Sequence, residues 1–130
     1  MGSAPSDDLL GRFRRLVDKY VPSLNFDDVT WAQLNTLEFG DEEVLRISRF
    51  SKLKGIELQG STVTDSGLAN LRGLKEIEEL NLRNTAITDA GLEFLRDLKS
   101  LEGIYLHNTD VTREGVDKLK QALPDCEIYQ

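Results

Sequence analysis

The sequence contains few of the residues that disulfides and metal sites require. Among its 130 residues there is one cysteine and one histidine. Cys126 therefore has no partner for an intramolecular disulfide, and the Cys/His sets of ordinary zinc sites are excluded. A single cysteine fits a reducing compartment best, so we expect a cytoplasmic protein, with an oxidising compartment as the open alternative.

Long apolar runs and positive charge are scarce as well. No segment approaches the roughly 20 apolar residues of a membrane-spanning helix, and the start, MGSAPSDD, lacks a secretory-signal pattern. The chain has 16 lysines and arginines against 23 aspartates and glutamates, a formal net charge of -7. Nucleic acids and anionic membranes bind basic surfaces, so we expect neither as a partner. The loose myristoylation pattern at Gly2 and Ser6 leaves lipid attachment as an alternative.

The motifs of common catalytic sites are missing too. The chain has no G-x-S-x-G elbow, no G-x-G-x-x-G and no phosphate-binding glycine loop followed by lysine. We therefore expect no catalytic residue, no metal site and no cofactor, and a protein that is not an enzyme.

What the sequence does contain is an internal repeat. GSTVTDSGLANL at 60–71, NTAITDAGLEFL at 84–95 and NTDVTREGVDKL at 108–119 are nearly the same stretch, each 24 residues from the next. The similarity extends to nine aligned columns, which is typical of repeat architectures. The columns are Leu53, Ile77, Leu101; Ile56, Leu80, Ile104; Leu58, Leu82, Leu106; Ser61, Thr85, Thr109; Val63, Ile87, Val111; Gly67, Gly91, Gly115; Leu68, Leu92, Val116; Leu71, Leu95, Leu119; and Leu74, Leu98, Ala122.

Each repeat combines two hydrophobic periods. Alternation, as in Leu80-Asn81-Leu82, predicts a short half-buried strand. Apolar residues at i, i+3 and i+6, as in Leu92, Leu95 and Leu98, predict one face of a helix of about nine residues. Neither element encloses a core alone, so neighbouring coils must stack at a fixed pitch.

The turn between strand and helix is the best-matched part of the repeat. Thr64, Thr88 and Thr112 are expected to cap the helices, with Asp65 and Asp89 placing negative charge at the helix starts. Because they lie one repeat apart, the two aspartates could also form a weak cation ladder, which Arg113 interrupts. The glycines of the first helical turn (Gly67, Gly91 and Gly115) are interpreted as positions where the backbone of the neighbouring coil passes too close for a side chain.

The pattern L-x-x-L-x-L-x-x-[NT]-x-[IV] resembles the leucine-rich repeat, and T-x-[IV]-T-D-x-G-L-x-x-L resembles its 24-residue version common in bacterial proteins. The chain is also similar to the cysteine-containing repeats attached to F-box domains, but Ser61, Thr85 and Thr109 stand where those carry Cys or Asn. The resemblance implies that these hydroxyls bond the loops between coils. It covers residues 34–130 and implies an α/β fold, a short right-handed solenoid with parallel strands on the concave side and helices on the convex side.

Two domains are expected, an N-terminal helical cap at 6–33 and leucine-rich repeats at 34–130, with about four coils and a closing strand. The cap would bury Leu9, Leu10, Phe13, Leu16, Val17 and Tyr20, and Trp31 is expected to pack at its junction with the repeats. Alternatively, the capping helix binds a partner.

Both ends of the array depart from the regular repeat. Leu34, Leu37 and Phe39 form an L-x-x-L-x-F pattern that predicts a first strand over 34–39. Phe39 lies 19 residues before Leu58 instead of 24, so the first repeat is expected to be shortened. Its helix would bury Val44, Leu45, Ile47, Phe50 and Leu53. At the other end, Ile128 falls in the strand column of Ile104. Cys126 is interpreted as a buried small hydrophobic residue, with a reactive thiol as the alternative.

The outward positions of the strands form the candidate site, because the core does not need them. They are Glu57, Asn81 and Tyr105 in one column and Gln59, Arg83 and His107 in the next, with Asn84 and Asn108 beside them. Arg and Tyr are favoured in binding hot spots, and His107 could make binding pH-sensitive. We expect a non-catalytic module, a monomer or weak oligomer, that binds a protein of unknown identity through its concave sheet. The alternative is an assembly subunit that docks through its N-terminal helix or its solenoid ends.

Overall fold

The computed structural model describes residues 29–33 and 37–130, and in this part of the chain five parallel strands form one sheet in the order β1-β2-β3-β4-β5. Neighbouring strands pair 24 residues apart, as Leu80 does with Ile56 and Ile104. The predicted period is therefore the spacing of the strands. The strands are β1 (Trp31–Gln33), β2 (Gly55–Glu57), β3 (Glu79–Asn81), β4 (Gly103–Tyr105) and β5 (Glu127–Tyr129).

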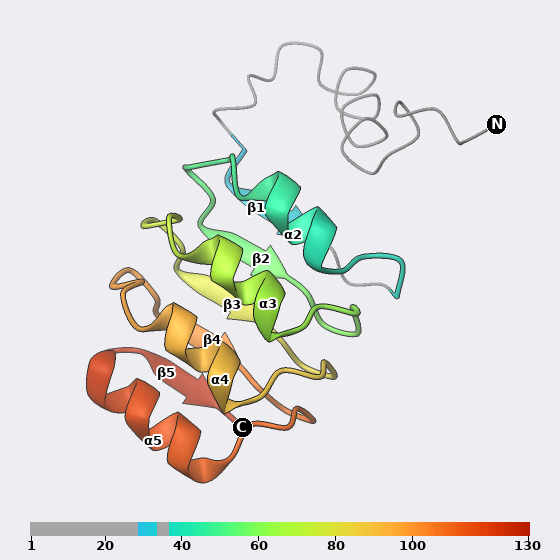
Figure 1. Ribbon diagram of the computed structural model, residues 1–130. Helices are drawn as coiled ribbons and strands as arrows, with labels where there is room; N and C mark the ends of the chain where they lie inside the picture. The colour runs from blue at the N-terminus through green and yellow to red at the C-terminus, as the bar shows by residue number, and fades with distance from the viewer. Residues whose placement is uncertain (1–28, 34–36) are drawn as a thin grey trace, which may run out of the picture.

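The helices lie in a single layer over one face of this sheet (Figure 1). They are α2 (Asp41–Ile47), α3 (Asp65–Leu68), α4 (Asp89–Leu92) and α5 (Arg113–Ala122), and the 3-10 helices η3 (Ala69–Leu71) and η4 (Glu93–Leu95) directly follow α3 and α4. The two middle helices are thus shorter than expected and tighten into 3-10 turns. The alternation of parallel strands and helices is that of a short α/β leucine-rich repeat solenoid, as predicted.

One continuous apolar core fills the space between the sheet and the helices. It runs from Val29 through each coil to Cys126, and Leu80 of the central strand is fully buried in it. A strand of three residues and a helix of four each offer one apolar face, so burial is complete only where coils stack on both sides.

The first coil keeps the 24-residue period, and the predicted shortened repeat is wrong. Ala32 of β1 pairs with Ile56, whereas Leu37 of the expected strand is 77% exposed. Phe39 lies 24 residues before Val63 and packs partly buried against the core. Ala32 occupies the strand column, but its small side chain gives no hydrophobic signal, so the stronger L-x-x-L-x-F pattern misplaced the strand.

The helix of this coil was predicted over 40–53, but α2 ends at Ile47, so Phe50 and Leu53 follow the helix. Val44, Ile47, Phe50 and Leu53 are buried, but Leu45 is 56% exposed. Leu45 falls in the repeat column of Ala69 and Glu93 rather than in a core column, which explains its outward direction.

The predicted cap lies largely outside the described residues. This applies to Leu9, Phe13 and the rest of its apolar face, and also to the myristoylation pattern and to Leu34. Three residues assigned to the cap, 31–33, instead form β1. Within the described part of the chain, none of the helices has the length and hydropathy that crossing a membrane requires.

Aspartates of the T-D turn connect one coil to the next. Asp65 accepts hydrogen bonds from the backbone N–H of Thr88 at 2.8 Å and from its hydroxyl at 2.5 Å. The same pair of bonds joins Asp41 to Thr64 and Asp89 to Thr112. We call these three pairs the Asp–Thr bridges.

Hydrogen bonding in a bridge also affects ionisation and capping. The Thr112 hydroxyl, and then its backbone N–H, lower the pKa of Asp89 below its ordinary value of 3.8. The stabilisation from this ionised bridge is therefore present above that value and is lost as the pH falls through the lowered pKa. The predicted helix caps form at Thr88 and Thr112, which accept from the backbone N–H of Ala90 and Gly115, whereas the Thr64 side chain makes no such bond.

The glycine column exists because of these bridges. A Cβ on Gly91 would overlap the Asp65 carboxylate, and Gly67 and Gly115 stand in the same relation to the aspartates of their preceding coils, Asp41 and Asp89. The close neighbour was expected to be backbone, and that expectation is wrong: it is a side chain. The repeated T-D-x-G pattern therefore records a contact between adjacent coils.

The loops after the strands are joined by amides and backbone rather than by the hydroxyls that the resemblance implied. Thr85 and Thr109 donate to carbonyls of their own coils, at 2.6 and 2.8 Å, because these short side chains turn back on the preceding strand. The Nδ2 of Asn108 donates to the Oδ1 of Asn84 across coils at 2.8 Å. Both asparagines, and Gly60 one repeat earlier, have positive φ angles, which Asn and Gly adopt most readily.

Candidate functional site

The six predicted side chains lie on or just beyond β2, β3 and β4, on the outer face of the sheet. Direct contacts between neighbours connect them. We call this group the sheet-face patch: Glu57, Gln59, Asn81, Arg83, Tyr105 and His107.

Asn81 organises one half of the patch. Its Nδ2 donates to Glu57 Oε2 and to Gln59 Oε1, both at 2.9 Å, and its Oδ1 accepts from the backbone N–H of Arg83 at 3.1 Å. The side chain is 8% exposed. Asn81 therefore orients its neighbours and has little surface of its own to offer.

The other half of the patch is a stack of flat groups. The Arg83 guanidinium carbon lies 4.6 Å from the centre of the Tyr105 ring, and its Nε approaches Nδ1 of His107 at 3.5 Å. On the side away from Arg83, the Tyr105 ring stacks on the ring of Tyr129 in β5, with ring centres 4.8 Å apart. Cation–π and stacking contacts hold these side chains in defined positions.

The sequence interpretation missed a third column on the same face. It begins with Trp31, Gly55, Glu79 and Gly103, two residues before the first predicted column. The Trp31 ring covers Gly55, and the Glu79 carboxylate covers Gly103, so that a Cβ on either glycine would overlap its neighbour. Counting back two residues from Glu57 would have revealed this alternation of large and absent side chains.

Trp31 lies on this face, where it is 46% exposed. Its predicted packing against the N-terminal cap involves residues outside the described part of the chain, but its own position in β1 is clear. The ring lies over Gly55, where the missing side chain leaves space for it.

Together these columns enclose a pocket of about 320 Å³, here called the Trp31–Glu79 pocket. Its lining residues are Trp31, Glu57, Glu79, Asn81, Arg83 and Tyr105. The charge of Glu79 is the main reason that the pKa of Tyr105 is raised above its ordinary value of 10, and burial adds to it. Glu79 Oε2 is buried and makes no hydrogen bond within the described residues.

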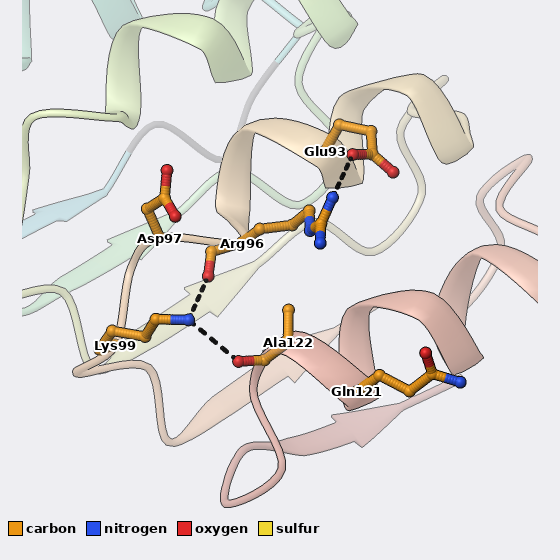
Figure 2. A pocket seen from close by; sticks show the side chains of 6 residues that line it. All are labelled: Glu93, Arg96, Asp97, Lys99, Gln121 and Ala122. Carbon is orange, nitrogen blue, oxygen red and sulfur yellow. Dashed lines mark hydrogen bonds and ion pairs between the residues drawn. The ribbon is translucent and has the colours of Figure 1, made fainter.

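A larger hollow of about 550 Å³ lies on the helix side of the molecule (Figure 2). Lys99 points into it and donates to the carbonyls of Arg96 and Ala122 at 3.0 and 3.1 Å, while Arg96 pairs with Glu93 at 3.2 Å. Lys99 thereby links the turn after η4 to the end of α5. These bonds within the chain make the hollow a structural junction.

Other candidate sites would draw on the acids and the single thiol of the described residues. There, no three His, Cys, Asp or Glu side chains are grouped so that they could hold a metal ion. Cys126 is a free, buried thiol, and burial raises its pKa to about 11. This agrees with its interpretation as a small core residue.

We expect Cys126 to resist alkylation in the folded protein. A rise of the pKa from its ordinary value of 9.0 to about 11 leaves roughly a hundredfold less thiolate at pH 7.5. Iodoacetamide labelling followed by mass spectrometry should be slow for the native chain and fast in denaturant, and equal rates would contradict this. Because the unfolded thiol ionises first, the stability from the neutral thiol should fall as the pH rises from about 9 to about 11.

Comparison with known proteins gives matches in structure but not in sequence. No protein-family model and no curated protein matches the chain. The structure of the Mex67:Mtr2 subunits of Chaetomium is similar, with 11% identity and a TM-score of 0.64 over 90% of this chain and 88% of that one. A leucine-rich repeat protein of Leptospira interrogans has 18% identity and a TM-score of 0.49, over 66% of this chain and 27% of that one. An internalin of Listeria monocytogenes has 14% identity and a TM-score of 0.48, over 79% of this chain and 41% of that one. At these identities the likeness is one of fold.

Proposed function

We propose that this chain is a non-catalytic protein-interaction module that binds a protein partner through the sheet-face patch. The observation that carries this proposal is the contact between Arg83 and Tyr105 on the outer face of the sheet, at 4.6 Å. These are residue types that dominate binding energy in interfaces. Tyr105 projects from β4 and Arg83 from the residues just after β3, and their contact holds both in place, so little side-chain freedom would be lost on binding.

The surroundings of this pair support the same use. Asn81 fixes Glu57 and Gln59 beside it, which gives a surface of mixed charge, amide and aromatic character as found in interfaces. We further propose a monomer or weak oligomer in a reducing compartment such as the cytoplasm, which the buried free thiol of Cys126 supports.

Replacing Arg83 and Tyr105 together by alanine should lower partner capture at least about tenfold, because truncated hot-spot residues typically cost 2 kcal/mol or more each. The measurement is affinity purification of the tagged chain with quantitative mass spectrometry. Thermal melting should change little, since neither side chain belongs to the core.

A matched control is available on the helix side. Arg72 lies over the Phe94 ring at 5.8 Å, so Arg72→Ala with Phe94→Ala removes the same kinds of groups from the opposite face. This control should retain the partner. Capture that is unchanged by the Arg83 and Tyr105 substitutions would refute the proposed use of the sheet face.

A further inference from the structure

The Trp31–Glu79 pocket contains a negative charge that the described residues leave unpaired. Other acids of the described residues do form ion pairs, such as Glu43 with Arg46 in α2 and Glu93 with Arg96 on the helix side. Glu79 forms no ion pair there; its Oε2 is buried without a hydrogen bond, and the carboxylate interacts with the Tyr105 hydroxyl. Because the buried Oε2 has lost its water without gaining a donor, a cation that reaches the carboxylate is favoured.

The arginine in the pocket lining does not neutralise the charge of Glu79. Arg83 lines the same pocket, but its guanidinium stacks on Tyr105 and its Nε points to His107. The second acid of the pocket, Glu57, accepts a hydrogen bond from the side-chain amide of Asn81, which is neutral. With two carboxylates and one arginine in its lining, the pocket is acidic, as is the chain as a whole.

Two glycines build the pocket. Gly55 leaves space for the Trp31 ring, and Gly103, two strands further along the sheet, leaves space for the Glu79 carboxylate. An alanine at either place would overlap the group above it. The result is an aromatic wall, an acid and a second aromatic ring, Tyr105, around one cavity of about 320 Å³.

We infer that the Trp31–Glu79 pocket receives an arginine side chain of a protein partner, an assignment that rests on the proposed function. Glu79 is the acceptor for the guanidinium, and the Trp31 ring offers a face on which this planar cation stacks. Arginine fits better than lysine because its flat, delocalised cation combines a forked hydrogen bond to a carboxylate with stacking on an aromatic ring. The unpaired charge and the negative lining supply the electrostatic complementarity.

The single tryptophan of the chain makes the test direct, since Trp31 fluorescence reports on this pocket alone. The probe is N-acetyl-arginine amide, titrated into the full chain. We expect a saturable fluorescence change. The neutral isostere N-acetyl-citrulline amide should bind at least about tenfold more weakly, because it lacks the charge that Glu79 pairs with. The lysine amide should bind more weakly than the arginine amide.

Two isosteric variants separate the role of Glu79 from a general charge effect. Glu79→Gln should weaken the arginine probe about tenfold, whereas Glu114→Gln, which removes an exposed charge from α5, should leave its affinity unchanged. Gly103→Ala, which keeps the charge but displaces the carboxylate, should also weaken binding. Unchanged melting temperatures would show that each variant is folded.

Equal responses to the arginine and citrulline amides, or full arginine binding by Glu79→Gln, would overturn the inference, and a lysine amide that binds as tightly as the arginine amide would overturn the choice of arginine. If partner capture still depends on Arg83 and Tyr105 in that case, the proposed function stands without the arginine pocket. Loss of that dependence would remove the proposed function itself.

Discussion

Replacing Leu80 by alanine is expected to lower the free energy of unfolding by about 3–5 kcal/mol, the range for a leucine truncated in a core that relaxes little. Leu80 lies in the central strand, is fully buried, and is flanked by Ile56 and Ile104 on the neighbouring strands. Coils on both sides fix its surroundings, so the cavity has few ways to close. The free energy of unfolding of a native domain is about 5–15 kcal/mol in total. The loss should therefore appear as a large drop in the urea concentration at the unfolding midpoint.

Leu45 provides the matched control. Leu45→Ala makes the same chemical change in a helix where the side chain is 56% exposed, and it should alter the unfolding free energy by no more than about 0.5 kcal/mol. Urea unfolding followed by circular dichroism measures both variants. Similar losses for Leu80→Ala and Leu45→Ala would contradict the assignment of one residue to the core and the other to the surface.

Removing the carboxylate of a central Asp–Thr bridge should have the second largest effect. Asp65→Ala deletes two hydrogen bonds to Thr88 and leaves its backbone N–H without the acceptor it has now. We expect a loss of about 1–3 kcal/mol in the free energy of unfolding. Gly91→Ala should also destabilise, because its Cβ would displace the same carboxylate, and this clash should exceed the gain of up to about 1 kcal/mol from alanine's helix propensity.

The two substitutions should be coupled. Once Asp65 is alanine, the group that Gly91→Ala would displace is gone, so the double variant should be more stable than the sum of the single effects predicts, by about 1 kcal/mol or more. Gly73 serves as the control, because a Cβ there meets nothing within 4 Å. Gly73→Ala should be near neutral and additive with Asp65→Ala. Additivity of the Asp65 and Gly91 effects in urea titrations would show that the glycine column has another cause.

The sequence predicted most of the fold because stacking forces the same residue types to recur. The columns of Ile56, Leu80 and Ile104 became the paired centres of successive strands, and Ile128 continues them. The strand of the first coil was not predicted, because the small side chain of Ala32 does not show that this residue belongs to the strand column. Hydrophobic pattern alone then favoured a strand at 34–39, although the 24-residue period already pointed to 31–33.

The candidate site was predicted less completely. Alternation along the strands gave the six residues of the sheet-face patch, because every second side chain of a strand points away from the core. Their mutual contacts did not follow from it. Nothing in the alternation pattern indicated that Asn81 would be buried or that Arg83 would lie over Tyr105.

The sequence by itself determined the repeat length, the order of strand and helix, and the side chains that face the core, because these follow from periodicity within one coil and its copies. Only the tertiary structure decided which atoms meet between coils. It is there that Asp65 bonds Thr88, that Gly91 leaves room for that carboxylate, and that Trp31 and Glu79 enclose a pocket. The direction in which a side chain leans across a 24-residue step depends on the space its neighbours leave, and that space exists only after the coils have stacked.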